Sequence, residues 1–327
     1  RMNRPSVTAY GAGRMGRGMA ICFAYAGHKV TLVDSRARDD VPAYEAALDA
    51  ELHQLLAMLR NLGMMPDGAS EILRNRISYF SHDAAGAALA DTQFLFEGVP
   101  ETEAAKTAAF AMLDAHLPET AIIASTTSSF LADLVAGWSR FPHRVLNAHF
   151  LNPAFLVPLV EVSPHAGTDQ TVTDRLVTLL EGAGKVPVIC AASPGYIVPR
   201  IQALAMNEAA RLVEEGVASA EDVDKAVRYG FGLRFAVLGL LEFIDWGGLD
   251  ILYYASGYMQ DAMKNDRFAA PDIIKAKMDA GETGMAVGKG MYDHDGRDID
   301  AFREEKLRQF TEMLKMNNAL RPPVLED

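Results

Sequence analysis

The stretch that decides the fold is VTAYGAGRMG, residues 7–16. Its first residues favour a β-strand, and the glycine-rich turn that follows opens a helix-like segment over residues 15–27. A second strand-like segment, residues 28–34, comes next and ends at Asp34. A strand, a helix and another strand in this order predict a parallel sheet with a right-handed crossover.

The turn fits the pattern G-x-G-x-x-G, and Asp34 lies 18 residues after its last glycine. In such a turn the glycines allow a tight bend, a close approach of phosphate to the backbone, and close packing of helix on strand. The helix N-terminus adds free N–H groups and the positive end of its dipole. The acid would accept hydrogen bonds from ribose hydroxyls and repel a 2′-phosphate, which favours NAD. The predicted NAD-binding residues are Gly11, Ala12, Gly13, Arg14, Met15, Gly16 and Asp34.

NADP stays open as an alternative, because Arg36 and Arg38 follow Asp34 closely.

Residues 1–192 have the pattern of a single α/β domain. Further strand-like segments cover residues 92–96, 121–124, 145–148, 156–162 and 186–190. The long leucine- and methionine-rich stretch from 42 to 76 is helical in character and broken near Gly63 and Pro66. We therefore expect a Rossmann-type doubly wound parallel sheet with an inserted helical hairpin.

Residues 193–327 show helical periodicity throughout. They predict a second, all-α domain that is apolar enough to form a homodimer.

The composition excludes several classes of protein. A length of 327 residues with 50% hydrophobic residues argues against disorder, and the formal charge of −12 argues against nucleic acid or an anionic membrane as a partner. No apolar run reaches the roughly 20 residues of a bilayer span. Two cysteines, Cys22 and Cys190, cannot build a disulfide framework and offer no metal-binding pair. With no hydrophobic leader before the first strand, we expect a cytoplasmic protein.

A second group of polar residues follows the strand predicted over 145–148. It comprises His149, Asn152 and Pro153, with Glu161 twelve residues after the histidine. Oxidation of an alcohol needs a base with a near-neutral pKa, and a buried carboxylate can hold the imidazole in the required tautomer. Spacing alone does not bring the two together, since either residue could be an ordinary core or surface group.

Taken jointly, these motifs resemble the L-3-hydroxyacyl-CoA dehydrogenase family over nearly the whole chain. The matching segments are the 11–16 turn with Asp34, EGVPE at 97–101 with Lys106, STTSS at 125–129, HFLNP at 149–153 with Glu161, and PGYIV at 194–198.

The resemblance implies an NAD-dependent dehydrogenase of fatty acid metabolism that reversibly oxidises an L-3-hydroxyl group to a ketone. His149 would be the general base and Glu161 its orienting partner. Ser128 would donate a hydrogen bond near the substrate oxygen, and Asn152 would shape the substrate site. Glu101 and Lys106 would contact the NAD ribose and neighbouring groups.

Three departures from the family pattern concern the substrate. Pro199 replaces an asparagine, and Thr126 replaces another. The segment after Gly230 contains Arg234 and resembles the branch that acts on small free hydroxy acids, such as L-gulonate 3-dehydrogenase and carnitine dehydrogenase. Arg234 could pair with a substrate carboxylate or bond helix C-terminal carbonyls.

A short L-3-hydroxyacyl-CoA, such as 3-hydroxybutyryl-CoA, is the favoured substrate, and a free 3-hydroxy acid recognised through Arg234 is the alternative. The inserted hairpin offers Arg60, Arg74 and Arg76 to CoA phosphates, with no lysine from residue 39 to 105. This is a thin supply of cations, but it is sufficient if the three arginines converge. A non-catalytic NAD-binding protein is a further alternative. A metal-dependent alcohol dehydrogenase is a weaker one, because no Cys/His cluster has zinc-ligand spacing and no metal is expected.

Overall fold

The computed structural model describes residues 4–325, and these form two compact units. The first unit ends at Leu204 and the second begins at Ala205. The division lies inside helix α8 (Val198–Glu214), beyond residue 192, where the sequence pattern changes to helical. The sequence pattern shows where the helices begin. The first residues of α8 are helical, but they belong to the unit that contains the sheet.

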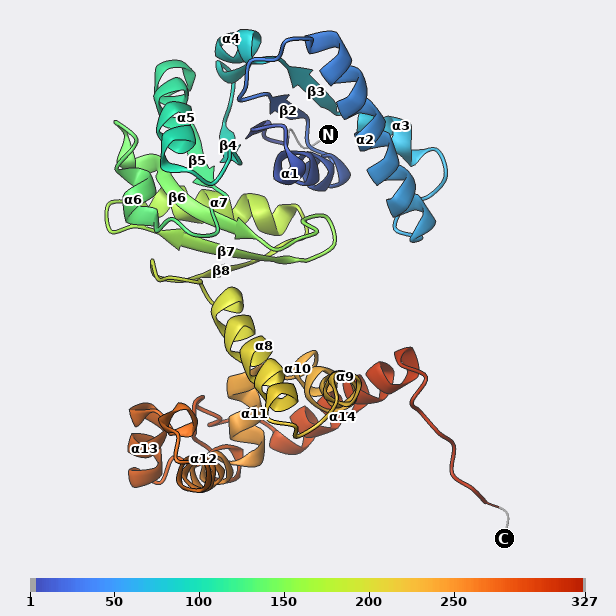
Figure 1. The fold of residues 1–327 in the computed structure, drawn as a ribbon, viewed down its shortest axis with the longest axis vertical. Coiled ribbons are helices and arrows are strands. Elements are labelled where there is room, and N and C mark those ends of the chain that lie inside the picture. The colour runs from blue at the N-terminus through green and yellow to red at the C-terminus, as the bar shows by residue number, and fades with distance from the viewer. Residues whose placement is uncertain (1–3, 326–327) are drawn as a thin grey trace. The chain divides into compact units, whose positions relative to one another are not determined.

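The first unit is built on one eight-stranded sheet with the order β3-β2-β1-β4-β5-β6-β7-β8 (Figure 1). Strand β1 pairs in parallel with both β2 and β4, so the chain leaves it in two directions and the sheet is doubly wound. The strands are β1 Val7–Tyr10, β2 Val30–Val33, β3 Ile77–Phe80, β4 Phe94–Glu97, β5 Ile122–Ser125, β6 Val145–Phe150, β7 Leu159–Pro164 and β8 Val186–Ile189.

The α/β fold class is confirmed, but two features of the sheet differ from the sequence prediction. Strand β7 pairs with β6 in the antiparallel sense, and β8 is parallel to β7, so the sheet is mixed. The reason is that the connection over residues 151–158 is too short for a crossover. Strand β3, at the edge beside β2, was not predicted, because residues 77–80 follow the helical hairpin without a turn signal of their own.

Helices cover both faces of the sheet and bury two apolar clusters. One cluster joins the strands to α1, α2 and α7 through residues such as Phe23, Leu52 and Leu176. The other joins them to α4, α5 and α6 through residues such as Phe110 and Val135. These helices are α1 Arg14–Tyr25, α2 Val41–Asn61, α3 Ala69–Arg74, α4 Ala85–Leu89, α5 Glu103–His116, α6 Ala132–Ala136 and α7 Gln170–Gly182.

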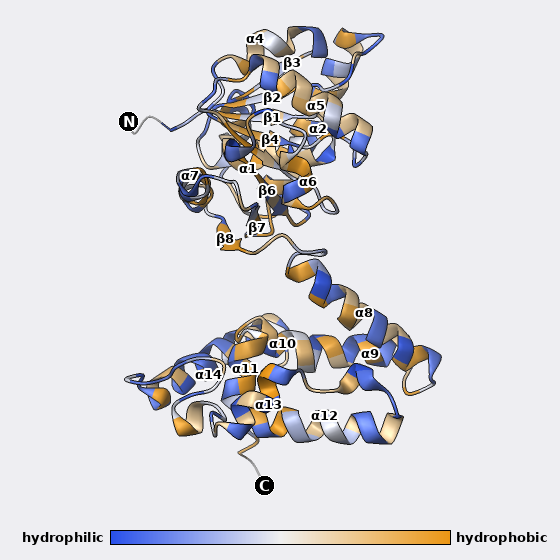
Figure 2. Cartoon of the chain, turned by 90° about the vertical axis from the view of Figure 1, so that its left-hand side faces the viewer, coloured by the Kyte–Doolittle hydropathy of each residue, from blue (hydrophilic) through white to orange (hydrophobic). Residues whose placement is uncertain are grey.

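Helices α2 and α3 form the inserted hairpin, whose break over residues 62–68 includes the predicted Gly63 and Pro66. The Asp40 side chain accepts a hydrogen bond from the Ala43 N–H and so caps α2. Figure 2 shows the strands coloured largely as hydrophobic, as expected for a sheet covered on both faces.

The second unit is helical, as predicted. The buried Asp245 carboxylate accepts hydrogen bonds from the N–H groups of Met291 and Tyr292 and contacts the His294 ring at 2.7 Å, which fixes the loop before the last helix. The helices of the second unit after α8 are α9 Ala220–Ala226, α10 Gly232–Phe235, α11 Leu240–Gly247, α12 Leu249–Met263, α13 Asp272–Asp279 and α14 Ile299–Met316. A π-helical turn follows α9 at Val227–Phe231.

Among residues 4–325, no helix combines the length and the apolar character that crossing a bilayer requires.

Two glycines of the β1–α1 turn allow a test of the fold. A Cβ at Gly16 would lie 1.8 Å from the Gly11 carbonyl oxygen, whereas one at Gly13 would meet nothing within 4 Å. We expect Gly16→Ala to lower the free energy of unfolding by about 3 kcal/mol or more, because backbone must move to relieve the overlap. Gly13→Ala is the matched control and should change it by less than about 1 kcal/mol. Urea denaturation of both variants measures the difference, and equal values would contradict the packing described.

Candidate active site

The N-terminus of α1 is open to an anion. Gly13 is the N-cap residue, no side chain caps the helix, and its first turn contains no acid. Gly13 and Arg14 are exposed, whereas Gly11, Ala12 and Gly16 are buried in the turn. The unpaired N–H groups of the first turn and the open space above Gly13 fit a pyrophosphate. Met15, partly buried, packs against the core behind the turn.

Asp34 follows β2, but its carboxylate is fully buried and already bonded within the chain. The Arg38 guanidinium donates to both oxygens at 2.7 and 3.1 Å, and the Arg36 N–H donates at 3.1 Å. The Tyr79 hydroxyl donates at 3.3 Å, and the pKa of Tyr79 is raised by burial and by the nearby carboxylate. Arg38 also lies over the Tyr44 ring, 3.9 Å from its centroid. A ribose hydroxyl would therefore compete with Arg38 for this acid.

A small cavity of about 180 Å³ lies at the carboxyl ends of β1, β2 and β4, where Ser35 and Arg36, the two residues after Asp34, line it. Its lining includes Tyr10, Arg36, His82 and Pro100.

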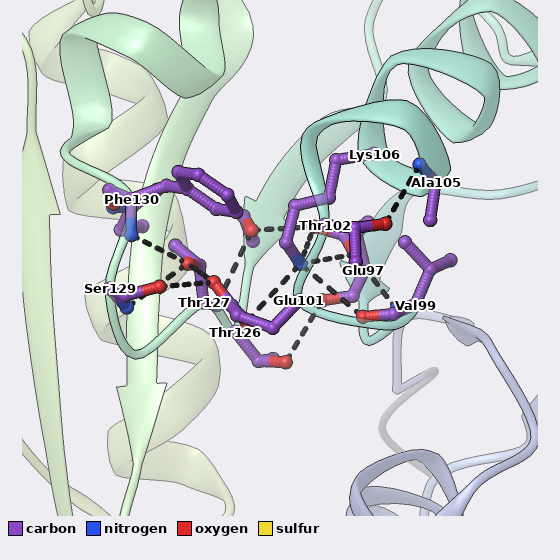
Figure 3. Close-up of polar contacts among 12 residues, drawn as sticks. Glu97, Val99, Glu101, Thr102, Ala105, Lys106, Thr126, Thr127, Ser129 and Phe130 are labelled. Carbon is purple, nitrogen blue, oxygen red and sulfur yellow. Dashed lines mark hydrogen bonds and ion pairs between the residues drawn. The ribbon is translucent and has the colours of Figure 1, made fainter.

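The buried pair of Glu97 and Lys106 joins β4 to α5 (Figure 3). The Lys106 amine donates to both Glu97 oxygens, at 2.9 and 3.2 Å, and is almost fully buried. Glu97 also accepts from the Ser125 hydroxyl at 2.5 Å and from the Val99 N–H at 2.8 Å. Lys106 is thus enclosed within the protein, and a direct contact with NAD, which the resemblance implies, does not fit this position.

Glu101 lies at the exposed edge of the same cluster, 3.7 Å from the Lys106 amine. The hydroxyls of Thr127 and Ser129 both donate to one of its oxygens, and the bond from Ser129 is 3.0 Å long. Figure 3 shows this carboxylate linking the loop after β4 to the loop after β5. Ser128 sits between its two partners and is exposed, with no hydrogen bond to another described residue.

The structure brings His149 and Glu161 together. They are directly opposite in the antiparallel register of β6 and β7, and the histidine Nδ1 lies 3.0 Å from the glutamate Oε1. Glu161 is fully buried, and its second oxygen accepts hydrogen bonds from the N–H groups of Ile197 and Val198, at 2.8 and 2.9 Å. His149 Nε2 makes no hydrogen bond to the described part of the chain, so it is free for a ligand.

Tyr196 is a site residue that the sequence analysis did not single out. Its ring stacks on the His149 imidazole with centroids 4.6 Å apart and an 8° angle between the planes. Its hydroxyl donates to the Thr127 carbonyl at 2.7 Å and contacts the Asn147 amide at 3.2 Å. Burial raises the pKa of this phenol. Tyr196 has a φ of 47°, in the left-handed region that few residues other than glycine adopt. The Pro-Gly pair directly before it was the sequence signal of this turn.

Pro199, which replaces a family asparagine, is the second residue of α8. The first N–H groups of a helix have no partner within it, so proline costs no hydrogen bond there. Compared with the family asparagine, Pro199 therefore lacks only the side-chain amide.

The two remaining predicted residues lie in different units. Asn152 is exposed and lines a cavity of about 780 Å³ between α1, α2 and residues 152–155. Arg234 is exposed on α10, with its guanidinium 5.3 Å from the Phe243 ring centroid. No hydrogen bond or ion pair joins that guanidinium to another residue in the range 4–325, so it does not cap carbonyls there. Within the same range, no group of three or more His, Cys, Asp or Glu side chains is arranged to hold a metal ion.

Comparison with known proteins gives the same assignment in both halves of the chain. Residues 6–193 match the NAD binding domain of 3-hydroxyacyl-CoA dehydrogenase, and residues 195–294 match its C-terminal domain. The 3-hydroxybutyryl-CoA dehydrogenase of Mycobacterium tuberculosis is 33% identical over 88% of this chain and 97% of its own. The 5-formyl-3-hydroxy-2-methylpyridine 4-carboxylate 5-dehydrogenase of Mesorhizobium japonicum is 28% identical over 93% of this chain and 95% of its own.

Among solved structures, the 3-hydroxyacyl-CoA dehydrogenase of Archaeoglobus fulgidus superposes with a TM-score of 0.76 at 28% identity, covering 97% of this chain and 100% of the other. The chain therefore belongs to the 3-hydroxyacyl-CoA dehydrogenase family and is an NAD-dependent oxidoreductase acting on CH–OH groups.

Proposed function

We propose that the chain oxidises the 3-hydroxyl group of a short L-3-hydroxy acid or of its thioester, with His149 as the general base. The observation that carries this proposal is the 3.0 Å contact between the His149 Nδ1 and the buried Glu161, which leaves Nε2 open.

The partners of Glu161 explain how this base works. Two backbone N–H groups donate to its second oxygen and so fix the carboxyl group with its first oxygen facing the His149 ring. When Glu161 accepts a hydrogen bond from the Nδ1–H of His149, the lone pair of the imidazole is on Nε2. When Nε2 takes the hydroxyl proton, the same carboxylate stabilises the imidazolium that forms.

NAD, when bound, supplies the hydride acceptor. The backbone of residues 11–16 would hold its pyrophosphate, and the cavity lined by Ser35 and Arg36 would take the adenosine end. Glu101, at the exposed edge of its cluster, would bind a ribose hydroxyl while Thr127 and Ser129 hold it in place. Lys106 would act through Glu101 and Glu97 as a positioning residue.

Ser128 would donate its hydroxyl hydrogen bond to the substrate oxygen, since it is exposed and otherwise unbonded. Asn152 would shape the substrate site from the loop that follows β6.

A short acyl-CoA is the first substrate to assay, because several relatives are named 3-hydroxybutyryl-CoA dehydrogenase. A free hydroxy acid is the second candidate. It is favoured by the exposed Arg234 without an acidic partner and by Pro199, which lacks the family amide. The Mesorhizobium japonicum relative, which matches 93% of this chain against 88% for the Mycobacterium tuberculosis relative, is named for a pyridine carboxylate, which is a free acid.

We also propose a homodimer formed by the second unit, which exposes large apolar side chains. A groove of about 530 Å³ on this unit is lined by α8, α9 and the π-helical turn, including Met206 and Phe231. We further propose that the protein acts in the cytoplasm and in fatty acid metabolism.

The role of His149 can be tested by replacement. His149→Ala should lower kcat about 10²–10⁴-fold, because no other group can take the hydroxyl proton from that position. His143→Ala, an exposed histidine just before the same strand, is the matched control. NADH formation measures both, and NAD affinity should change in neither. An unchanged rate for His149→Ala would show that His149 is not the general base.

Tyr196→Phe separates the stacked ring from the hydroxyl. We expect the free energy of unfolding to fall by about 1 kcal/mol at pH 7, through loss of the bond to Thr127, with kcat nearly unchanged. Because burial raises the pKa of Tyr196, the folded protein keeps a proton that the unfolded chain releases above about pH 10. The free energy of unfolding of the wild type therefore falls above that pH, and its advantage over Tyr196→Phe should shrink. Urea denaturation at both pH values checks this, and a constant difference would contradict it.

Asp34 and Arg38 should act in opposite directions on cofactor choice. Asp34→Ala removes the ribose acceptor and frees the Arg38 guanidinium for a 2′-phosphate, so the preference for NAD over NADP should fall about tenfold or more. Arg38→Ala should raise it. Steady-state kinetics with both cofactors measures the ratio. If neither variant moved the ratio, this ion pair would have a purely structural role.

A further inference from the structure

The inserted hairpin carries the wrong charge for a polyphosphate. We call residues 39–76, which contain α2 and α3, the arm. The arm has three arginines against seven acidic residues, which gives a formal charge of −4. Coenzyme A carries roughly four negative charges at neutral pH on its 3′-phosphate and pyrophosphate. The acids are Asp39, Asp40, Glu45, Asp49, Glu51, Asp67 and Glu71.

The three arginines of the arm do not converge. Arg74 donates to the Asp49 carboxylate at 2.5 Å and to the Ile77 carbonyl at 2.7 Å. Arg76 donates to the Ala24 carbonyl at 2.8 Å, at the end of α1. Arg60 is exposed near the end of α2 and alone has no partner among the described residues. The convergence that would let these three arginines suffice for the CoA phosphates is therefore absent.

The cavity between the arm and α1 has a different character. It measures about 780 Å³, and residues 152–155, which follow the strand of His149, form one of its walls. Its charged lining residues are Arg14, Arg17 and Glu51. Arg17 pairs with Glu51 at 2.9 Å, whereas Arg14 has no acidic partner in the described chain. The net charge of this lining is one positive charge, which matches one carboxylate and not four phosphate charges.

We infer that the substrate is a compact free 3-hydroxy carboxylate and not a CoA thioester, and that its carboxylate binds in this cavity beside Arg14 and Arg17 and not at Arg234. This inference rests on the proposed oxidation of a 3-hydroxyl group and names the substrate class. An Arg–carboxylate contact of this kind supplies both charge and orientation, whereas the acidic arm repels the CoA nucleotide.

Three forms of the same acyl group test the substrate class. L-3-Hydroxybutyrate, its CoA thioester and its N-acetylcysteamine thioester share the reacting carbon, and only the CoA form carries phosphates. We expect kcat/KM to be at least about tenfold higher for the acid than for either thioester, with no advantage of the CoA form. A CoA thioester that exceeds its N-acetylcysteamine analogue about tenfold would overturn the inference.

Titration of the NAD-bound protein with CoA itself is independent of turnover. The inference predicts no saturation below about 1 mM, and a Kd under about 10 μM would overturn it. If no compound were oxidised, the proposed function would fail, while this titration would still decide whether the arm accepts CoA.

Two substitutions in the cavity should move the Michaelis constant of the acid in opposite directions. Arg17→Gln should raise it about tenfold, and Glu51→Gln should lower it severalfold, because Arg17 loses its competing partner. Glu45→Gln, exposed on the same helix and outside the cavity lining, is the matched control with an unchanged value. The KM for NAD separates these effects from cofactor binding. If Glu51→Gln and Glu45→Gln had the same Michaelis constant for the acid, the substrate carboxylate would not bind in this cavity.

Discussion

The arrangement around Glu161 is the constraint on which the rest of the site depends. A fully buried carboxylate without partners would cost several kcal/mol. Here it contacts the His149 ring and accepts two backbone N–H bonds from the start of α8. His149 and Glu161 are only twelve residues apart, and they can face each other on adjacent strands because β6 and β7 form an antiparallel pair. A parallel crossover needs a dozen or more connecting residues. The reversal of β7 in an otherwise doubly wound sheet is therefore what allows the pair.

Helix α8 links this pair to the second unit. The N–H groups that hold Glu161 belong to the turn at its start, and the division between the units falls inside the same helix. Tyr196, in that turn, stacks on His149 and bonds the loop after β5. The proposed base is thus held by groups from three segments: its own hairpin, the loop that contains Thr127, and the start of the helix.

The sequence could predict the parts of the fold and site that depend on local pattern. The turn after β1, the strand that ends at Asp34 and the hairpin break near Gly63 all follow from residue type and spacing. It could not predict strand β3, which has no glycine or proline directly before it, or the stacking of Tyr196 on His149, which depends on two segments far apart in the chain. The burial of Lys106 was missed for a similar reason. A lysine on a helix is usually solvated, and its partner Glu97 lies on a strand.

The arm and the His149–Glu161 pair lie on different elements in this fold. The groups proposed for proton transfer and for NAD binding lie at strand ends and in the turns that follow them, where backbone geometry fixes them. The arm contributes no residue to the His149–Glu161 pair, so its charge can change without disturbing that pair. Family membership therefore determines the bond that is oxidised, while the inferred choice of a free acid over a CoA thioester depends on the charges of the arm and of the cavity beside it. Arg74 is held by Asp49 and Arg17 is shared with Glu51, so few cations remain for a polyphosphate, which is the basis of the inferred free-acid substrate.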